Sequence, residues 1–395
     1  MKSQELLGDS NALGFLVLEA LKPHGWGSAD PNSIVVAQHS GGSGNTTFRV
    51  RAAGIDGVEI KPSEVALHSK DPWHMRQYAR TAAAATLFGD HGVSPKRLAS
   101  GVDWVIEPWE GNGEPTWATV NDMKVLGSEL AKLHKVPTDW YDSFGAKLKE
   151  ENPCLASVPA GSHIWWYLAN YKLDSIFEHN DPACMAEWAQ PMFTPLSKAG
   201  ARIVNCHGDL KECNMVSLAD GCAMEDGLVK FIDLDFVHVN AACHDLAFVC
   251  FHQEDSPMRE KEPPMSERPD VGAMRRSFLE SYLHAMGDAS SKEDVDALLI
   301  DTCLAACGHH FGIVGQSSVF GSNLDPEAIS GLTRFKEHAA ELLASDAEQN
   351  RFHEAGPEGW FALKGYGKLI KTNSSEGVIE AFRFFSRIAE LDPQL

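Results

Sequence analysis

The sequence predicts an α+β fold in which a small, strand-rich part precedes a larger, mostly helical part. Two patterns indicate this fold. Short apolar or alternating runs, typical of strands, fill the first third of the chain, whereas apolar residues recur at helical spacing from about residue 113 onward. With 395 residues, the chain is also long enough to bury two separate cores. We therefore expect an N-terminal nucleotide-binding lobe over residues 1–110 and a helical C-terminal lobe over residues 111–395.

The N-terminal part contains four segments with the composition of strands and one with that of a helix. The helical segment, residues 76–89, is rich in alanine and is closed by Gly89. It separates the third strand candidate from the fourth, and one helix among several strands is typical of a lobe built on an antiparallel sheet. The strand candidates are residues 33–39, 47–52, 64–69 and 104–109.

The C-terminal part is expected to be helical. Its first helix has Asn121 as a candidate cap and Pro137 as a stop, and its apolar residues at helical spacing are Met123, Leu126, Leu130 and Leu133. Two short apolar runs, residues 202–206 and 229–235, interrupt the helical pattern and lead directly into acidic residues. Further helices are expected over residues 165–177, 275–286 and 295–306, and loops over residues 254–270, 321–325 and 348–359.

Charge and composition restrict the classes of partner. The chain carries 34 basic and 55 acidic residues, a net charge of −21, so we expect it to repel nucleic acid and anionic membrane surfaces and to suit a cationic small molecule. No apolar stretch approaches the roughly 20 residues that cross a bilayer, so membrane insertion is not expected. The N-terminus lacks the pattern of a signal peptide, and the nine cysteines include no CxxC pair. These features predict a cytoplasmic protein without a disulfide framework.

The strongest chemical signal is His207-Gly-Asp209, followed by Asn214 and, after a further apolar run, by Asp233. Phosphoryl transfer from a nucleotide needs a carboxylate that orients the attacking hydroxyl and accepts its proton, and it needs oxygen ligands that hold magnesium on the phosphates. Asp209 on a tight loop and Asn214 five residues later can face one site, and Asp233 can return to it on a neighbouring strand. Carboxylate and amide oxygens suit magnesium. The alternative is a pair of buried strand ends with unrelated polar residues.

A glycine-rich segment lies between the first two strand candidates. Its residues are Gly41, Gly42, Ser43, Gly44 and Asn45. Glycines allow the backbone to turn sharply and to approach a phosphate closely. The segment is not a Walker loop, because no Lys-Ser or Lys-Thr pair follows at the required spacing. By itself it would be a hairpin turn, but ahead of the acidic motif we interpret it as a loop that covers nucleotide phosphates.

Together these motifs resemble those of the choline/ethanolamine kinase family, within the superfamily of aminoglycoside phosphotransferases and protein kinases. The resemblance also extends over residues 104–109, 126–137, 244–248 and 278–283. It implies a bilobal protein-kinase-like fold, ATP and Mg²⁺ as cofactors, and a role in phospholipid precursor metabolism. It further implies Asp209 as the catalytic base, Lys211 as a contact of the γ-phosphate, and Asn214 and Asp233 as magnesium ligands.

The same resemblance implies a nucleotide site and a substrate site. Glu107 and Trp109 lie in the segment whose backbone would grip adenine. Asp235 and Asp245 become candidates for an acidic wall that faces a substrate ammonium group. For Asp245, a structural hydrogen bond back to the catalytic loop is an equally good alternative.

Three departures from the family pattern concern phosphate and substrate binding. The family places a basic residue on the third strand to hold the α- and β-phosphates, and here that position falls on His68, with Lys70 two residues later. The helical segment that follows contains no acidic partner for such a residue. Phe311 retains one aromatic residue of the family's ammonium-binding cage, but Gly312 and Gly315 stand where two tryptophans are expected.

We therefore expect a small-molecule kinase that transfers the γ-phosphate of ATP to a hydroxyl group of a small, amine-bearing metabolite. Two alternatives stay open. One is the same fold acting on another alcohol, such as an aminoglycoside-like compound or a sugar alcohol. The other is a pseudokinase that binds a nucleotide or a partner protein; the altered third strand favours it, whereas the intact Asp209, Asn214 and Asp233 argue against it. The sequence leaves the oligomeric state open, and a homodimer is compatible with it.

Overall fold

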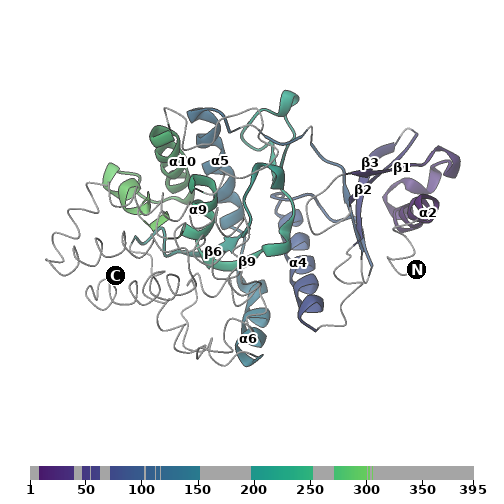
Figure 1. Cartoon of the computed structure of the whole chain (residues 1–395), viewed down its shortest axis with the longest axis horizontal. Coiled ribbons are helices and arrows are strands. Elements are labelled where there is room, and N and C mark those ends of the chain that lie inside the picture. The colour runs from purple at the N-terminus through teal and green to yellow at the C-terminus, as the bar shows by residue number, and fades with distance from the viewer. Residues whose placement is uncertain are drawn as a thin grey trace, which may run out of the picture. The chain divides into compact units, whose positions relative to one another are not determined.

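The structure is a computed structural model with two compact units, Met1–Thr116 with Glu212–Asp235, and Trp117–Lys211 with Phe236–Leu395. Figure 1 labels several of their elements. The expected strand 64–69, the expected helix 165–177 and the three expected loops lie outside the described residues. The described residues are 9–39, 47–53, 55–62, 72–101, 104–111, 113–115, 117–151, 197–251, 271–299, 301–302 and 305.

The first unit is built on a five-stranded antiparallel sheet with the strand order β1-β2-β3-β5-β4. Three of the four expected strands correspond to β1, β2 and β5, and the predicted combination of an antiparallel sheet with a helix is confirmed. The strands are β1 Val35–His39, β2 Thr47–Ala52, β3 Ile55–Pro62, β4 Ala99–Ser100 and β5 Trp104–Pro108.

The third described strand, β3, was not among the expected segments. It is Ile55–Pro62, because this segment is hydrogen-bonded to β2 on one side and to β5 on the other. Apolar and charged residues alternate in Val58-Glu-Ile-Lys61, as expected for a strand. Gly57 and Pro62 are turn-forming residues that obscure this alternation in the sequence. Pairing with two neighbouring strands, rather than local composition, therefore determines where the third strand lies.

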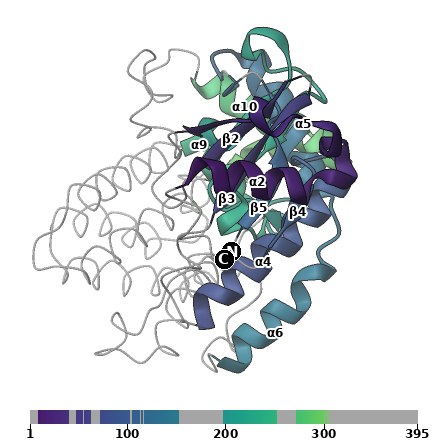
Figure 2. The same cartoon turned by 90° about the vertical axis from the view of Figure 1, so that its right-hand side faces the viewer.

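One face of the sheet is covered by a helix that the sequence analysis did not predict, α2 Ser10–Ala20. Figure 2 shows α2 lying across the strands. Asp9 caps the helix, because its side chain accepts hydrogen bonds from the backbone N–H groups of Asn11 and Ala12 (2.9 and 3.1 Å). The core between this helix and the sheet consists of Leu13, Val17, Leu21, Trp26, Phe48, Val50, Ala52 and Ile106.

The first unit also contains helix α4 and a short antiparallel ladder. Helix α4, Pro72–Asp90, includes the expected helical residues 76–89. The ladder pairs β7 Met215–Ser217 with β8 Val229–Phe231. The backbone N–H of Phe231 donates to the carbonyl of Val93 (2.9 Å), so the end of β8 lies beside the segment that follows α4.

The second unit is mainly helical. Helix α5 Val120–His134 packs against α10 Val271–Met286 (Figure 1), and a hydrogen bond joins the hydroxyl groups of Ser128 and Ser281 (2.9 Å). A two-stranded antiparallel sheet pairs β6 Ile203–Cys206 with β9 His238–Ala241. The expected helices around 121–137 and 275–286 are thus confirmed. The other described helices of this unit are α6 Asp142–Glu151, α9 Cys243–Phe251 and residues 292–299.

The cap of α5 is Thr119 and not Asn121. The Oγ1 atom of Thr119 accepts a hydrogen bond from the N–H of Asp122 (3.1 Å), and Oδ2 of Asp122 accepts one from the N–H of Thr119 (2.8 Å). This reciprocal capping box satisfies two backbone donors at the start of the helix. Asn121 lies inside the first turn, where its side chain cannot replace that pair of bonds.

Short 3₁₀ helices complete the described chain. Within the described ranges, no helix is long and apolar enough to cross a bilayer. The cysteines in this part of the chain, at positions 206, 213, 222, 243 and 250, are all free thiols. The 3₁₀ helices are η1 Lys22–His24, η2 Trp26–Ser28, η3 Pro31–Ser33, η4 Asp139–Tyr141, η8 Glu212–Asn214, η9 Asp220–Cys222 and η10 Leu234–Phe236.

Gly127 permits the close approach of α5 to α10. A Cβ atom added at this position would lie 2.3 Å from the carbonyl oxygen of Phe278 and 3.0 Å from the backbone nitrogen of Tyr282. Both atoms belong to the backbone of α10, so they cannot move unless the helix moves. Any side chain at this position would therefore push the two helices apart.

We predict that Gly127→Ala lowers the free energy of unfolding by about 1–3 kcal/mol, even though alanine has the higher helix propensity. Gly272→Ala in α10 is the matched control, because a Cβ there would meet no atom within 4 Å. The control should leave stability unchanged or raise it by up to about 1 kcal/mol. Urea unfolding followed by circular dichroism measures both variants, and equal effects would contradict the close contact.

Candidate functional site

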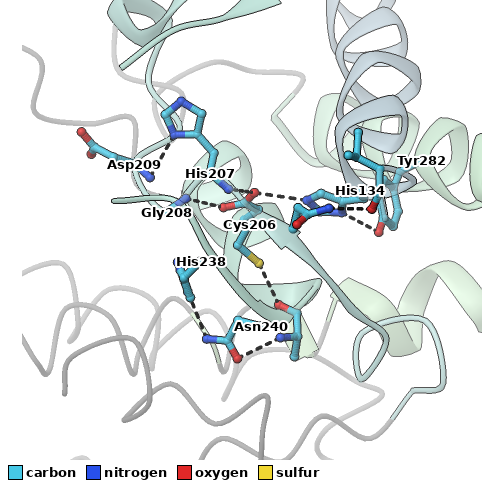
Figure 3. A network of polar contacts seen from close by, with 12 residues as sticks. His134, Cys206, His207, Gly208, Asp209, His238, Asn240 and Tyr282 are labelled. Atoms are coloured by element: carbon cyan, nitrogen blue, oxygen red, sulfur yellow. Dashed lines mark hydrogen bonds and ion pairs between the residues drawn. The ribbon is translucent and has the colours of Figure 1, made fainter. Parts of the chain in front are cut away.

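The loop that carries Asp209 follows strand β6. Gly208 has a φ angle of +81°, a left-handed conformation in which glycine is strongly favoured. His207 is fully buried, and its Nδ1 atom accepts a hydrogen bond from the backbone N–H of Asp209 (3.3 Å). Figure 3 shows the Asp209 side chain pointing away from the buried network beneath the loop. The loop therefore buries the side chain of His207 and directs that of Asp209 away from the buried network.

The Asp209 carboxylate is accessible and lies beside a positive charge. Its side chain is 17% exposed and forms an ion pair with Lys211, whose side chain is 42% exposed. The Nζ atom of Lys211 lies 2.8 Å from Oδ1 and 3.0 Å from Oδ2 of Asp209. Ion pairs between exposed groups are weak and readily rearranged. The structure thus brings two of the predicted catalytic residues together within reach of a solute.

The carboxylate of Asp245, at the start of α9, is hydrogen-bonded to the backbone of this loop. Its Oδ2 atom accepts a hydrogen bond from the backbone N–H of His207 (2.6 Å), and its Oδ1 atom accepts one from that of Gly208 (2.9 Å). The Oδ2 atom also lies 3.1 Å from Nε2 of His134. The Asp245 side chain is completely buried. This geometry is that of a structural support for the loop, the second of the two alternatives considered for Asp245.

Asp245 remains ionised in spite of its burial. Burial by itself would raise its pKa, but the hydrogen bond from His134, the charges of His134 and His207 and the N–H of Gly208 outweigh that effect and lower the pKa of the carboxyl below its ordinary value. Burial raises the pKa of the neighbouring Cys206 thiol well above its usual range, so this side chain is neutral. The Asp245 carboxylate is therefore a stabilised negative charge next to a neutral thiol.

Three further hydrogen bonds connect the network to helix α10 and to the segment after α5. The hydroxyl of Tyr282 lies 2.8 Å from Nδ1 of His134 (Figure 3), so both ring nitrogens of His134 have partners. Asn205, one residue before the end of β6, donates to the carbonyl of Val136 (2.6 Å) and accepts from Nε1 of Trp140 (2.7 Å). The strand that leads into the loop is thus bonded to a segment about 70 residues away in sequence.

His134, Cys206 and Asp245 form the one cluster of three close His, Cys, Asp or Glu side chains in the described part of the second unit. Their ligand atoms lie within 4.8 Å of one another, and all three residues are buried. We interpret the cluster as a hydrogen-bonded core and not as a metal site, because both ring nitrogens of His134 and both oxygens of Asp245 already have protein partners.

Asn214 and Asp233 flank the ladder of the first unit at the same end. Asn214 precedes β7, Asp233 follows β8, and the backbone N–H of Ile232 donates to the carbonyl of Asn214 (2.9 Å). Asn214 is buried and Asp233 is exposed. Asp233 also has a φ angle of +60°, a left-handed conformation that few non-glycine residues adopt, aspartate more readily than most. Strain of this kind persists where the surroundings fix the backbone, and it often occurs at functional sites.

Glu107 and Trp109, the expected adenine-contacting residues, are both half-buried and lie at the end of β5. The guanidinium carbon of Arg49 lies 4.6 Å from the centre of the Trp109 ring, in a cation–π contact. Arg49 is on β2 and was not singled out from the sequence, because no motif marks an arginine at an alternating strand position. It is an additional polar group beside the candidate adenine site.

Lys61 is a second residue that the sequence analysis missed. It lies on β3, where its register partner is Val105 on β5. The third strand is where a phosphate-binding basic residue was expected, and Val58-Glu-Ile-Lys61 has the form of the Val-Ala-Ile-Lys motif of protein kinases. That pattern is the signal that would have identified it. Lys61 is therefore the basic residue that β3 carries, whereas His68 and Lys70 lie outside the described residues.

Of the other predicted site residues, only Asp235 lies within the described part of the chain. Asp235 is half-buried within η10. The remaining candidates lie outside the described residues; they are Gly41, Gly42, Ser43, Gly44, Asn45, His68, Lys70 and Phe311, together with Gly312 and Gly315.

We predict that Asp245→Asn destabilises the chain by about 1–3 kcal/mol for each backbone N–H that loses its acceptor, because the asparagine amide group is itself a donor. The folded-state pKa of Asp245 is lowered. Its contribution is therefore complete above the ordinary carboxyl pKa and is lost as the pH falls through the folded value. In urea unfolding, the difference from wild type should be largest near neutral pH and shrink in acid. The exposed Asp220→Asn is the control, and a pH-independent difference would contradict the ionised state.

No protein-family model matches the sequence, and a comparison with curated proteins finds no match. Two solved structures have a similar fold. An ethanolamine kinase from Plasmodium vivax matches with a TM-score of 0.56 and 15% identity, over 82% of this chain and 87% of that chain. A choline kinase from Cryptosporidium parvum Iowa II matches with a TM-score of 0.54 and 14% identity, over 85% and 97%. The predicted resemblance is thus confirmed at the level of the fold, and the chain has an α+β kinase-like fold that it shares with these two proteins.

Proposed function

We propose that this protein is an ATP- and Mg²⁺-dependent phosphotransferase that moves the γ-phosphate to a hydroxyl group of a small, amine-bearing metabolite. The observation that carries the proposal is the loop of residues 207–209, in which a buried, ionised Asp245 binds two backbone N–H groups while Asp209 stays accessible. A carboxylate on a rigid loop can hold a substrate hydroxyl in one orientation, which is the main requirement of this reaction.

In this mechanism Asp209 orients the acceptor hydroxyl and accepts its proton as the oxygen attacks the γ-phosphate. Lys211 pairs with Asp209 in the structure. We propose that it moves to an oxygen of the γ-phosphate once ATP is present, because a partly exposed ion pair costs little to exchange. The terminal phosphate is then held close to a hydroxyl that Asp209 has already positioned.

The residues present fit a magnesium ion. Asn214 and Asp233 offer an amide oxygen and a carboxylate, the hard ligands that magnesium prefers, and a backbone hydrogen bond joins Asn214 to the residue before Asp233. We propose that these two side chains hold the ion. When bound, Mg²⁺ would neutralise negative charge on the phosphate oxygens.

For the nucleotide, we propose Lys61 as the contact of the α- and β-phosphates and the segment of Glu107 and Trp109 as the adenine contact. Residues 41–45 would cover the phosphates. A two-lobed arrangement with the nucleotide-binding lobe at the N-terminus is part of the same proposal. The proposal also includes a cytoplasmic location and a role in phospholipid precursor metabolism. Whether the protein forms a homodimer stays open.

The amine-bearing substrate is supported by charge and by the named activities of the two similar structures. The net charge of −21 favours a cation. The similar proteins are named as an ethanolamine kinase and a choline kinase. Of the two acidic candidates for the ammonium group, we favour Asp235, because both carboxylate oxygens of Asp245 are already bonded within the protein. Phe311 would add an aromatic face.

The pseudokinase alternative loses its main argument. It rested on a third strand without a lysine, whereas β3 contains Lys61. An aminoglycoside-like compound or a sugar alcohol stays an alternative acceptor, and the first experiment below distinguishes these classes.

We predict that Asp209→Ala lowers kcat by roughly 10²–10⁴-fold, because it removes the general base. The assay measures ADP release from ATP and Mg²⁺ with a panel of amino alcohols, sugar alcohols and aminoglycosides. Thermal stabilisation by ATP and Mg²⁺ should persist in the variant. The exposed Asp220→Ala serves as the control and should keep wild-type activity. If wild type and Asp209→Ala were equally inert while both bound ATP, the pseudokinase would be the better description.

We predict that Lys61→Met weakens ATP binding by roughly 10–100-fold, which corresponds to the loss of one charge-assisted hydrogen bond. Lys70→Met and the exposed Lys124→Met in α5 should change it by less than about threefold. Thermal-shift titrations with ATP at fixed Mg²⁺ measure all three variants. A larger effect of Lys70→Met than of Lys61→Met would return the phosphate contact to the residue first expected from the sequence.

A further inference from the structure

Helix α4 contributes a buried arginine to the segment that follows Asp233. Arg80 is 5% exposed, and its Nη2 atom donates a hydrogen bond to the carbonyl oxygen of Asp235 (2.7 Å). Asp235 lies within η10, two residues after Asp233. Both partners belong to the first compact unit. A contact across 155 positions therefore ties the middle of a helix to the turn that carries a candidate metal ligand.

The turn needs such support because Asp233 has a left-handed backbone. A φ angle of +60° is sparsely populated even for aspartate, and hydrogen bonds on either side of such a residue help to keep it in that conformation. On the N-terminal side of Asp233, the N–H of Ile232 is bonded to the carbonyl of Asn214 (2.9 Å). On the C-terminal side, the carbonyl of Asp235 is bonded to Arg80. The two bonds fix the backbone before and after the strained residue.

Arginine is well suited to this position. The guanidinium group stays charged at all relevant pH values, and burying it is costly unless polar groups surround it. The segment that it contacts carries two carboxylates, at positions 233 and 235. Helix α4 contains no acidic residue before its last position, where Asp90 forms an ion pair with Lys96 (2.9 Å). Its Arg80 side chain binds the turn that carries the candidate metal ligand Asp233.

We propose that Arg80 is a positioning residue that holds Asp233 in the orientation required to bind the metal ion. The inference rests on the proposed function in one respect, namely that Asp233 is a metal ligand. Arg80 itself touches neither metal nor substrate. Its effect reaches the ion through the backbone of residues 233–235, so its loss should raise the metal concentration that the protein requires.

The experiment uses the full chain, Mn²⁺ as the metal probe and a non-hydrolysable ATP analogue at fixed concentration. The Mn²⁺ concentration that gives half of the maximal thermal shift is measured for each variant. Outer-shell partners of metal ligands typically change metal affinity by 10–100-fold, so we expect Arg80→Met to raise this concentration about tenfold or more. Arg80→Lys keeps the charge but loses the planar fork, and it should recover part of the affinity.

Arg97→Met is the matched control. Arg97 lies in the same unit, is partly buried, and donates from Nη1 to the carbonyl of Ala82 in α4 (3.3 Å). It should alter thermal stability but leave the half-saturating Mn²⁺ concentration within about twofold of wild type, because its hydrogen bond goes to α4 and not to the turn of Asp233. This control separates a specific effect on the position of Asp233 from a general loss of stability around α4.

The outcomes distinguish a failure of the proposed metal site from a failure of the proposed role of Arg80. If wild type shows no Mn²⁺-dependent shift, or if Asp233→Asn leaves that shift unchanged, the metal site itself is wrong. If Asp233→Asn abolishes the shift whereas Arg80→Met and Arg97→Met behave alike, only the role of Arg80 is refuted. Should Arg80→Met fail to fold, Arg80→Lys decides: an unchanged Mn²⁺ requirement overturns the proposal, and an increase of about threefold or more supports it.

Discussion

The buried carboxylate of Asp245 is the group on which the candidate catalytic loop depends. An isolated charge in a protein interior is very unfavourable, and it persists only where hydrogen-bond donors surround it. Here the backbone N–H groups of His207 and Gly208 and the ring of His134 provide those donors. The dependence is mutual: the loop keeps its shape because the carboxylate binds it, and the carboxylate stays ionised because the loop and His134 bind it.

Environment separates the roles of the acidic residues. Asp245 is enclosed and bonded on both oxygens, so it is structural, whereas Asp209 is accessible and paired with a partly exposed lysine. Asp233 is exposed on a strained turn that Arg80 and Asn214 bracket through the backbone. Residues of one chemical type thus serve as support, base and metal-ligand candidates because their burial and their partners differ.

Much of the fold and the motif of the site were predictable. Strands β1, β2 and β5 and helices α4, α5 and α10 follow from local periodicity, and the acidic motif could be recognised because its residues are close in sequence. The errors share one cause. Strand β3 contains turn-forming residues and is defined by pairing on both sides, and α2 is defined by the sheet face that it covers. Neither pairing nor coverage can be seen in a local window of sequence.

The sequence by itself determined which side chains are available: Asp209 in a short motif after an apolar run, Asn214 and Asp233 as candidate oxygen ligands, and a kinase-like order of strands and helices. Only the tertiary structure showed that both oxygens of Asp245 are bonded within the protein, placed Lys61 on β3, and connected α4 to the turn of Asp233. The physical reason is that residue type and spacing are local properties. Burial, strand register and contacts across more than 100 positions depend on how distant segments pack.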